Sequence, residues 1–192
     1  MFKRCGRPTV VTVAFLFALM MFARPSSAQP TAEDRNAVYL ELGGSGGVFS
    51  INYEREISDR IRARVGFGWW TSESFFGDGE TSLTTVPFTV TGLPGRGAHR
   101  LELGGGLTFG NRDVENNPEA SGTFLSLTGL VGYRYHRPGR GFLFRAGFTP
   151  FYEFGDVDVA YPDKGFFPSL GISFGYAFWA ATEDQKKPVE VR

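Results

Sequence analysis

The segment "SLGISFGYAF", residues 169–178, alternates between small or polar residues and large apolar residues. Its odd-numbered members are Ser, Gly, Ser, Gly and Ala, and its even-numbered members are Leu, Ile, Phe, Tyr and Phe. Successive side chains of a β-strand point to opposite faces of the sheet, so a strand here has one small face and one wholly apolar face. The segment predicts a strand that separates two very different environments.

Seven further segments alternate apolar residues with polar residues or glycine in the same way. They are residues 38–43, 49–54, 61–69, 84–91, 101–109, 125–135 and 142–149. Eight such strands are typical of a barrel whose apolar face meets lipid. A sheet in hydrocarbon must close on itself, because unpaired backbone groups are costly there. We therefore expect an all-β protein, an eight-stranded antiparallel up-and-down transmembrane β-barrel, with Pro87 weakening the fourth strand.

The start of the chain has a different pattern. Three basic residues precede an apolar stretch from Val10 to Phe22, and Ser26-Ser27-Ala28 follows. This order predicts a secretory signal peptide cleaved after Ala28, and the apolar stretch is shorter than the ~20 residues that a spanning helix needs. An uncleaved anchor is the alternative. The expected organisation is a signal peptide (1–28), a periplasmic segment (29–35), the barrel (36–178) and a polar periplasmic tail (179–192).

The connections between the predicted strands differ in length. Those after the third, fifth and seventh strands, residues 71–82, 111–122 and 153–167, are long and polar, as external loops of outer-membrane barrels usually are. The first external loop, "GSGG", is very short. Lys+Arg and Asp+Glu are balanced at 20 each, so the charge gives no indication of a nucleic-acid partner.

The pentapeptide "LELGG" occurs at residues 40–44 and again at 101–105. Both copies fall on strands that rise from the periplasm, with leucines toward lipid and a glutamate toward the interior. A weaker likeness joins "RVGF" (64–67) to "RAGF" (145–148). Duplication of a four-strand half explains both likenesses, and so does the resemblance that any two alternating strands share.

The inward positions of these strands carry both carboxylates and guanidinium groups. The predicted polar network of the lumen is Glu41, Asn52, Glu54, Arg62, Arg64, Glu102, Arg134 and Arg145. An eight-stranded barrel is just wide enough for side chains to fill, and such groups pair through charge-assisted hydrogen bonds. We expect a salt-bridge network that fills the barrel, with an ion-binding or gated pathway as the alternative.

Aromatic residues near the strand ends predict the belts that anchor a barrel at the two membrane interfaces. The membrane-interface aromatics are expected to be Trp69, Trp70, Tyr133, Tyr135, Phe151, Tyr152 and Phe178.

Motifs for catalysis and metal binding are weak. Residues 43–47 match G-x-S-x-G formally, but a strand follows in place of the helix that a nucleophile elbow needs, so Ser45 is a loop residue. Both histidines, His99 and His136, fall in predicted periplasmic turns. Asp156 and Asp158 lack the spacing of a calcium loop. We expect no enzyme, no catalytic residue, no metal and no cofactor.

The last strand carries the most specific motif. Ser169, Gly171, Phe174 and Tyr176 resemble the assembly signal that the barrel assembly machinery reads in outer-membrane proteins. With the signal peptide and the strands, the chain resembles small barrels of the OmpA and OmpX type and, more closely, the uncharacterised outer-membrane β-barrel proteins of Gram-negative bacteria. The resemblance implies an outer-membrane location, contact with outer-membrane lipid and lipopolysaccharide, and no nucleic-acid or known protein partner.

Three functions remain open at this point. The first is a structural or surface-interaction barrel with a filled lumen, and the second is a narrow channel or transporter for small solutes. The third is a soluble periplasmic, lipocalin-like barrel that binds an apolar ligand, which would require the apolar face to point inward.

Overall fold

The computed structural model describes five stretches of the chain. They are residues 35–73, 80–115, 121–137, 141–154 and 166–178. The expected signal peptide, the segment 29–34 and the tail 179–192 lie outside the described residues, as do the central parts of the long loops. The chain divides into a unit Met1–Thr31 and a unit Ala32–Arg192, and every described residue belongs to the second.

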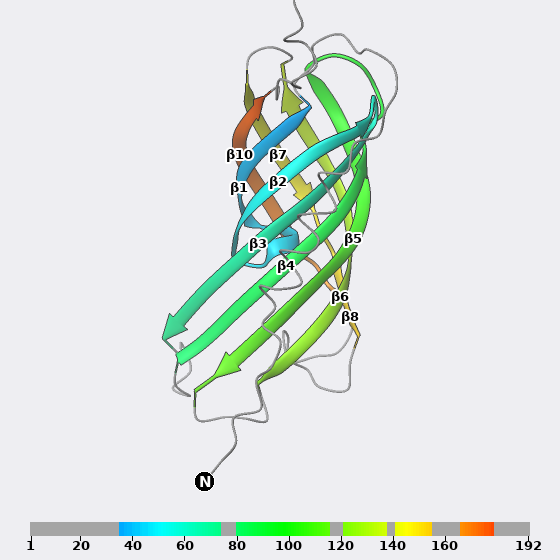
Figure 1. The fold of residues 1–192 in the computed structure, drawn as a ribbon. Coiled ribbons are helices and arrows are strands. Elements are labelled where there is room, and N and C mark those ends of the chain that lie inside the picture. Colours follow the sequence, from blue (N-terminus) through cyan, green and yellow to red (C-terminus); the bar gives the residue numbers. More distant parts are fainter. Residues whose placement is uncertain (1–34, 74–79, 116–120, 138–140, 155–165, 179–192) are drawn as a thin grey trace, which may run out of the picture. The chain divides into compact units, whose positions relative to one another are not determined.

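One antiparallel sheet contains all the strands. They are β1 (Asn36–Gly43), β2 (Phe49–Ser58), β3 (Ile61–Glu73), β4 (Glu80–Gly92), β5 (His99–Val114), β6 (Gly122–His136), β7 (Phe142–Phe148), β8 (Phe151–Phe154), β9 (Phe166–Phe167) and β10 (Leu170–Phe178). Their order is β5-β4-β3-β2-β1-β10-β7-β6-β8-β9, and the additional pairing of β5 with β6 closes the sheet (Figure 1). β7 with β8 forms the seventh strand and β9 with β10 the eighth. The predicted eight-stranded antiparallel barrel is confirmed.

Proline accounts for the interruptions of the strands. Pro150 lies between β7 and β8, and Pro168 lies between β9 and β10. Proline has no N–H to donate to a ladder, so both strands break where it occurs. Pro87 stays inside β4, paired with Thr108 on β5. Between β3 and β4 the paired residues pass from Val65↔Phe88 directly to Gly68↔Thr85. The ladder is therefore interrupted on the side of β3 only.

The two faces of the sheet differ as the alternation predicts. Large apolar side chains are exposed on the outside, among them Leu40, Ile51, Leu101, Val131 and Phe174. Charged and hydroxyl side chains are buried on the inside. No helix in the stretches that the structure describes is both long enough and apolar enough to cross a bilayer.

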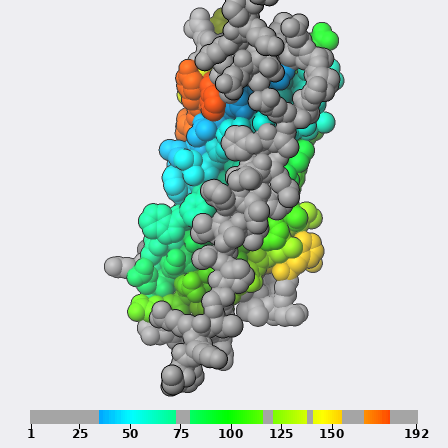
Figure 2. All heavy atoms as spheres, viewed as in Figure 1, coloured from blue at the N-terminus to red at the C-terminus, as the bar shows by residue number. Residues whose placement is uncertain are grey.

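The strands reach unequal distances from the end of the barrel where Asn36 and Phe178 lie. β3 extends to Glu73 and β5 to Val114, so much of the expected loops 71–82 and 111–122 is strand. The sequence did not predict these strand extensions, because few apolar residues alternate there. The backbone hydrogen bonds between strands form without such alternation. β1 ends at Gly43, and β2 begins at Phe49. In Figures 1 and 2 the blue and cyan hairpin of β1 and β2 ends well before β3–β5 do.

The connection between β1 and β2 folds into the barrel, which corrects the expectation of a short external loop. Residues Gly44–Gly46 form one turn of 3₁₀-helix (η1), and all three are buried. Gly43, Gly44 and Gly47 have φ of 69°, 74° and 89°, a region that favours glycine. These positive φ angles let the chain turn inward. The barrel wall then hydrogen-bonds the turn: Thr108 donates to the Ser45 carbonyl (2.9 Å) and Thr85 to the Gly46 carbonyl (2.6 Å).

Candidate functional site: the ionic interior of the barrel

The eight residues expected in the lumen all lie on the inner face and are exposed by 4% or less. They come from six strands: Glu41 on β1, Asn52 and Glu54 on β2, Arg62 and Arg64 on β3, Glu102 on β5, Arg134 on β6 and Arg145 on β7. The structure brings them together in three groups of contacts. In each group, the side chains occupy positions that the alternation of the strands already places on the inner face.

Glu102 and Arg145 form the first group. Arg145 donates from Nε to one carboxylate oxygen of Glu102 and from Nη2 to the other, both at 2.7 Å. A guanidinium that meets a carboxylate through two parallel hydrogen bonds makes a strong, directional pair. The pair joins β5 to β7 across the interior.

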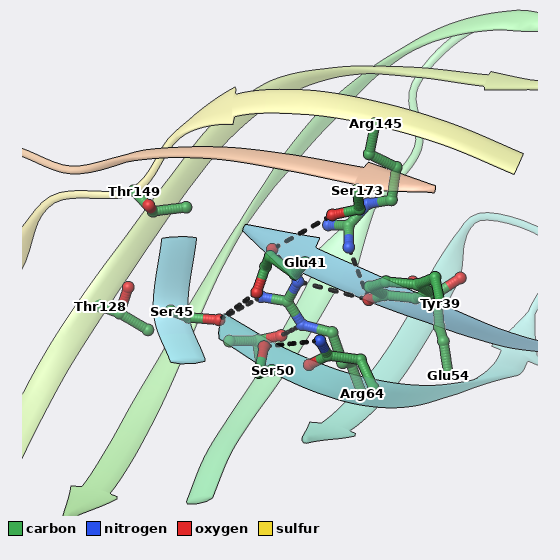
Figure 3. A network of polar contacts seen from close by, with 12 residues as sticks. Tyr39, Glu41, Ser45, Ser50, Glu54, Arg64, Thr128, Arg145, Thr149 and Ser173 are labelled. Carbon is green, nitrogen blue, oxygen red and sulfur yellow. Dashed lines mark hydrogen bonds and ion pairs between the residues drawn. The ribbon is translucent and has the colours of Figure 1, made fainter. Parts of the chain in front are cut away.

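Glu41 and Arg64 form the second group, which Figure 3 shows from close by. Arg64 donates to Glu41 (3.1 Å), to the Thr89 hydroxyl (2.7 Å) and to the Ser45 hydroxyl (2.7 Å). Ser173 on β10 donates to the same carboxylate at 3.4 Å. This group therefore ties the inward turn η1 to β1, β3, β4 and β10.

Tyr39 connects these two groups, and the sequence analysis did not select it. Its hydroxyl accepts hydrogen bonds from Arg64 (3.3 Å) and from Arg145. The guanidinium carbon of Arg145 also lies 4.9 Å from the centre of the Tyr39 ring, a cation–π contact. The sequence alternation could have identified Tyr39, because Tyr39 lies between the outward-facing Val38 and Leu40 and must therefore face inward.

The third group lies nearer the end of the barrel that holds Asn36. Glu54 pairs with Arg134 at 2.7 Å and with Arg62 at 3.6 Å. Arg62 also pairs with Glu56. The side-chain amide of Asn52 donates a hydrogen bond to the Ser50 hydroxyl at 2.9 Å. Arg62 and Arg134 thus share the Glu54 carboxylate.

A small cavity lies beside the first two groups. A cavity of about 10 Å³ is bordered by Glu41, Glu102, Arg145 and Ser173, among other residues. That is the room of about one water molecule. Side chains and the turn η1 fill the barrel at this level.

The two copies of LELGG occupy matching places in the network. Glu41 pairs with Arg64 of "RVGF", and Glu102 pairs with Arg145 of "RAGF". In each half the glutamate on the half's first strand pairs with the arginine on its third strand. The glycines of the two copies differ in role, because Gly43 and Gly44 begin the inward turn whereas Gly104 and Gly105 continue β5.

Five of the seven expected interface aromatics lie on the outer face. Trp69, Tyr133 and Tyr152 are exposed, and Tyr135 and Phe178 are half-buried. The prediction for Phe151 is wrong: it is 5% exposed and shares the inner face with Thr149. Trp70 lies on the opposite face of β3 from Trp69, because it pairs with Leu83, whose side chain approaches the turn at Gly47, and it is 43% exposed. Phe151 and Tyr152 cannot belong to one belt, because neighbours on a strand face opposite sides of the sheet.

The residues of the expected assembly signal lie on or beside β10. Phe174 and Tyr176 are exposed on the outer face, and Gly171 is buried against Gly44. Ser169 lies between β9 and β10, where its carbonyl accepts from the Thr149 amide at 2.8 Å.

Catalytic geometry is not assembled around Ser45. Its hydroxyl accepts a hydrogen bond from Arg64 and lies 3.5 Å from a Glu41 carboxylate oxygen. His99 instead contacts Tyr133. Across the described stretches, no group of three or more His, Cys, Asp or Glu could hold a metal ion. Asp156 and Asp158 lie outside those stretches.

A substitution in the turn measures how tightly it is held. A Cβ on Gly44 would overlap the Glu41 carboxylate, at a position where φ is +74°. A non-glycine residue at such φ costs about 1–2 kcal/mol. Gly44→Ala is expected to cost this strain plus displacement of the Glu41 side chain, measured by urea unfolding of the refolded barrel. Gly95→Ala is the control, because Gly95 has φ of +103° and no atom within 4 Å of its Cβ position. Equal losses for both variants would contradict a tightly held turn.

Comparison with known proteins gives matches among solved structures. No protein-family model matches this chain, and no curated protein matches it. The N-terminal β-barrel domain of Pseudomonas aeruginosa OprF is 18% identical, with 75% of this chain and 98% of that chain covered and a TM-score of 0.49. Neisserial surface protein A is 16% identical, with 74% of this chain and 92% of that chain covered and a TM-score of 0.48. Ail, the attachment invasion locus protein of Yersinia pestis, is 16% identical, with 74% of this chain and 95% of that chain covered and a TM-score of 0.43. The strand pairings of this chain by themselves establish its eight-stranded barrel.

Proposed function

We propose that this chain is an integral outer-membrane β-barrel protein with a side-chain-filled polar lumen and a structural or surface-interaction role. The observation that carries the proposal is the sorting of side chains between the two faces. Apolar side chains are exposed around the outside, where water would oppose them, while buried glutamates and arginines pair inside. Lipid is the environment that suits such an exterior.

The other two functions fit the geometry less well. A soluble lipocalin-like barrel needs an apolar interior, and the interior between η1 and the Asn36 end is ionic. A narrow channel needs a continuous aqueous path, whereas the Glu41–Arg64 and Glu102–Arg145 pairs and the turn η1 occupy the interior of the barrel.

The surroundings of the protein follow from the same proposal. Residues 1–28 direct export and are removed, and the barrel contacts outer-membrane lipid and lipopolysaccharide. The barrel assembly machinery reads Ser169, Gly171, Phe174 and Tyr176. The aromatic residues at Trp69, Tyr133 and Tyr152 support this proposal, because their exposed rings suit a membrane interface.

Heat-modifiability tests the membrane location. Outer-membrane fractions are run on SDS gels with and without boiling, and the unboiled protein is expected to migrate differently because a closed barrel resists the detergent. Recovery of the protein in the soluble periplasm, with no difference in mobility, would contradict the proposal.

Single-channel conductance tests the filled lumen. The intact barrel in a planar bilayer is expected to give no resolved conductance steps. The double variant Glu41→Ala/Arg64→Ala removes both members of a pair, so it leaves no unpaired buried charge from that pair. It is expected to open a path and give discrete steps, whereas Thr71→Ala on the outer face is not. Steps of equal size in the intact barrel and the double variant would favour the channel.

A further inference from the structure

The interior changes character on the far side of η1, away from the Asn36 end. Five large apolar side chains lie on the inner face there: Trp70, Leu83, Phe124, Phe151 and Phe167. We call them the apolar ring. Their direction follows from the pairings: Trp70 pairs with Leu83, and Phe151 pairs with Phe167. Leu83 approaches Gly47 of the inward turn. The Phe124 ring covers Gly110 on β5.

The polar interior and the apolar ring are separated by the turn itself. Thr85 and Thr108 lie on the inner face at the level of η1 and donate to its carbonyls. Their hydroxyls are therefore engaged by the protein at the floor of the ring. Polar inward positions adjoin the ring: Ser72 follows Trp70 on the inner face of β3, and Arg112 on β5 pairs with Leu83. The compartment therefore has both apolar and polar side chains on its wall.

The wall beside the apolar ring is incomplete among the described residues. β2 pairs with β3 only as far as Ser50↔Gly68, and β1 pairs with β10 only as far as Gly43↔Gly171. Beyond these pairs, residues 69–73 of β3 and residues 166–170 near the start of the eighth strand continue, and no described strand lies between them. The space that two further strand segments would occupy is three inter-strand spacings wide, about 14 Å.

The borders of this gap are continuous with the lipid-facing surface. Leu170, Phe166 and Trp69 point outward on its two sides and are 73%, 66% and 61% exposed. Val48, at the end of the short hairpin below the gap, is exposed as well. Among the described residues, apolar side chains therefore border the gap both on the outside of the barrel and at the apolar ring.

We propose that the apolar ring binds the hydrocarbon chain of an outer-leaflet lipid, which enters sideways through the gap between β3 and β9. The inference rests on the proposed outer-membrane location. A sideways opening at the lipid-facing band favours an occupant already in the membrane over one from water. The polar side chains that adjoin the ring, Ser72 and Arg112, suit the head group of the same lipid.

The test uses tryptophan fluorescence and lipids with a dibrominated chain, since bromine quenches a nearby indole. Trp69 and Trp70 are neighbours on opposite faces, which gives a matched pair. One protein keeps only Trp70 (Trp69→Phe, Trp179→Phe), and the other keeps only Trp69 (Trp70→Phe, Trp179→Phe). Both are refolded into phosphatidylcholine vesicles with and without the brominated chain. We expect bromine to quench Trp70 as strongly as Trp69.

Two variants on β4 distinguish quenching by a lipid chain inside the ring from quenching by the surrounding bilayer. Leu83→Arg places a charge in the ring and is expected to reduce the quenching of Trp70 at least threefold, with Trp69 unchanged. Ser82→Arg, one residue away on the other face, is expected to leave the quenching of Trp70 unchanged. Refolding of each variant is checked by its gel mobility without boiling.

Other results would overturn the inference. If bromine quenches Trp69 but not Trp70, the barrel lies in the membrane and the ring holds no lipid chain. If an aqueous quencher reaches Trp70 fully and bromine does not, the ring is filled with water. If cross-linking shows a second copy paired along residues 69–73, another chain fills the gap. Quenching of neither tryptophan would contradict the membrane location itself.

Discussion

Glu102→Gln is expected to lower the free energy of unfolding of the barrel by about 3–5 kcal/mol, the cost of leaving a buried charge without its partner. Arg145 is buried, and both carboxylate oxygens of Glu102 accept from it at 2.7 Å. A glutamine keeps one acceptor oxygen but turns the other position into a donor that faces the guanidinium. Urea unfolding of the refolded protein in vesicles, followed by gel mobility without boiling, measures the loss.

Two further proteins make this measurement specific. Glu80→Gln removes a carboxylate from an exposed residue at the far end of β4, where an effect within ±0.5 kcal/mol is expected. Glu102→Gln/Arg145→Met removes both charges and is expected to recover part of the stability lost in Glu102→Gln, because no buried charge of that pair is left unpaired. A Glu102→Gln protein as stable as the Glu80→Gln protein would show that the pair does not hold the interior together.

Leu40→Arg is expected to cost about 2–4 kcal/mol in a bilayer, the range for a basic residue on the lipid face at the midplane. Leu40 is exposed on the outer face of β1, where it pairs with Ile51 on one side and Phe174 on the other. All three side chains belong to the apolar band, so the arginine would have no polar neighbour in it. Urea titration of folding into vesicles gives the difference from the unchanged protein.

Thr71→Arg is the matched control for depth. Thr71 is exposed on the outer face of β3 near the far end of that strand, where the same substitution costs about 0–1 kcal/mol. In a water-soluble barrel both positions would tolerate arginine equally. Equal stability of the two variants would therefore contradict the membrane location, whatever the state of the lumen.

The eight strands could be predicted because one physical rule governs every position along them. Lipid outside and a filled polar interior impose a two-residue period, which residues 169–178 show without exception. The rule stops where the surroundings change. Thr71–Glu73 and Asn111–Val114 carry little apolar alternation, yet they continue β3 and β5, because backbone pairing needs no apolar face.

The interior could be predicted in its charges but not in its arrangement. Alternation places Glu41, Arg64 and Arg145 inside, but it does not say which carboxylate meets which guanidinium. That depends on the register of strands far apart in the sequence. The turn at Ser45 shows the same limit, since a short glycine-rich loop is compatible with an outward or an inward course. The hydrogen bonds from Thr85, Thr108 and Arg64 to the turn distinguish the two courses.

The polar network also constrains how the barrel closes. β1 and β10 are the first and last strands, and the contacts near this seam join residues more than a hundred positions apart: Ser173 with Glu41, and Arg145 with Tyr39. A slip of β10 by one residue would turn Phe174 inward and Ser173 outward. The Glu41 carboxylate would then face an aromatic ring without its hydroxyl partner. The polar residues that fill the barrel thus favour the observed register between β1 and β10 over a register shifted by one residue.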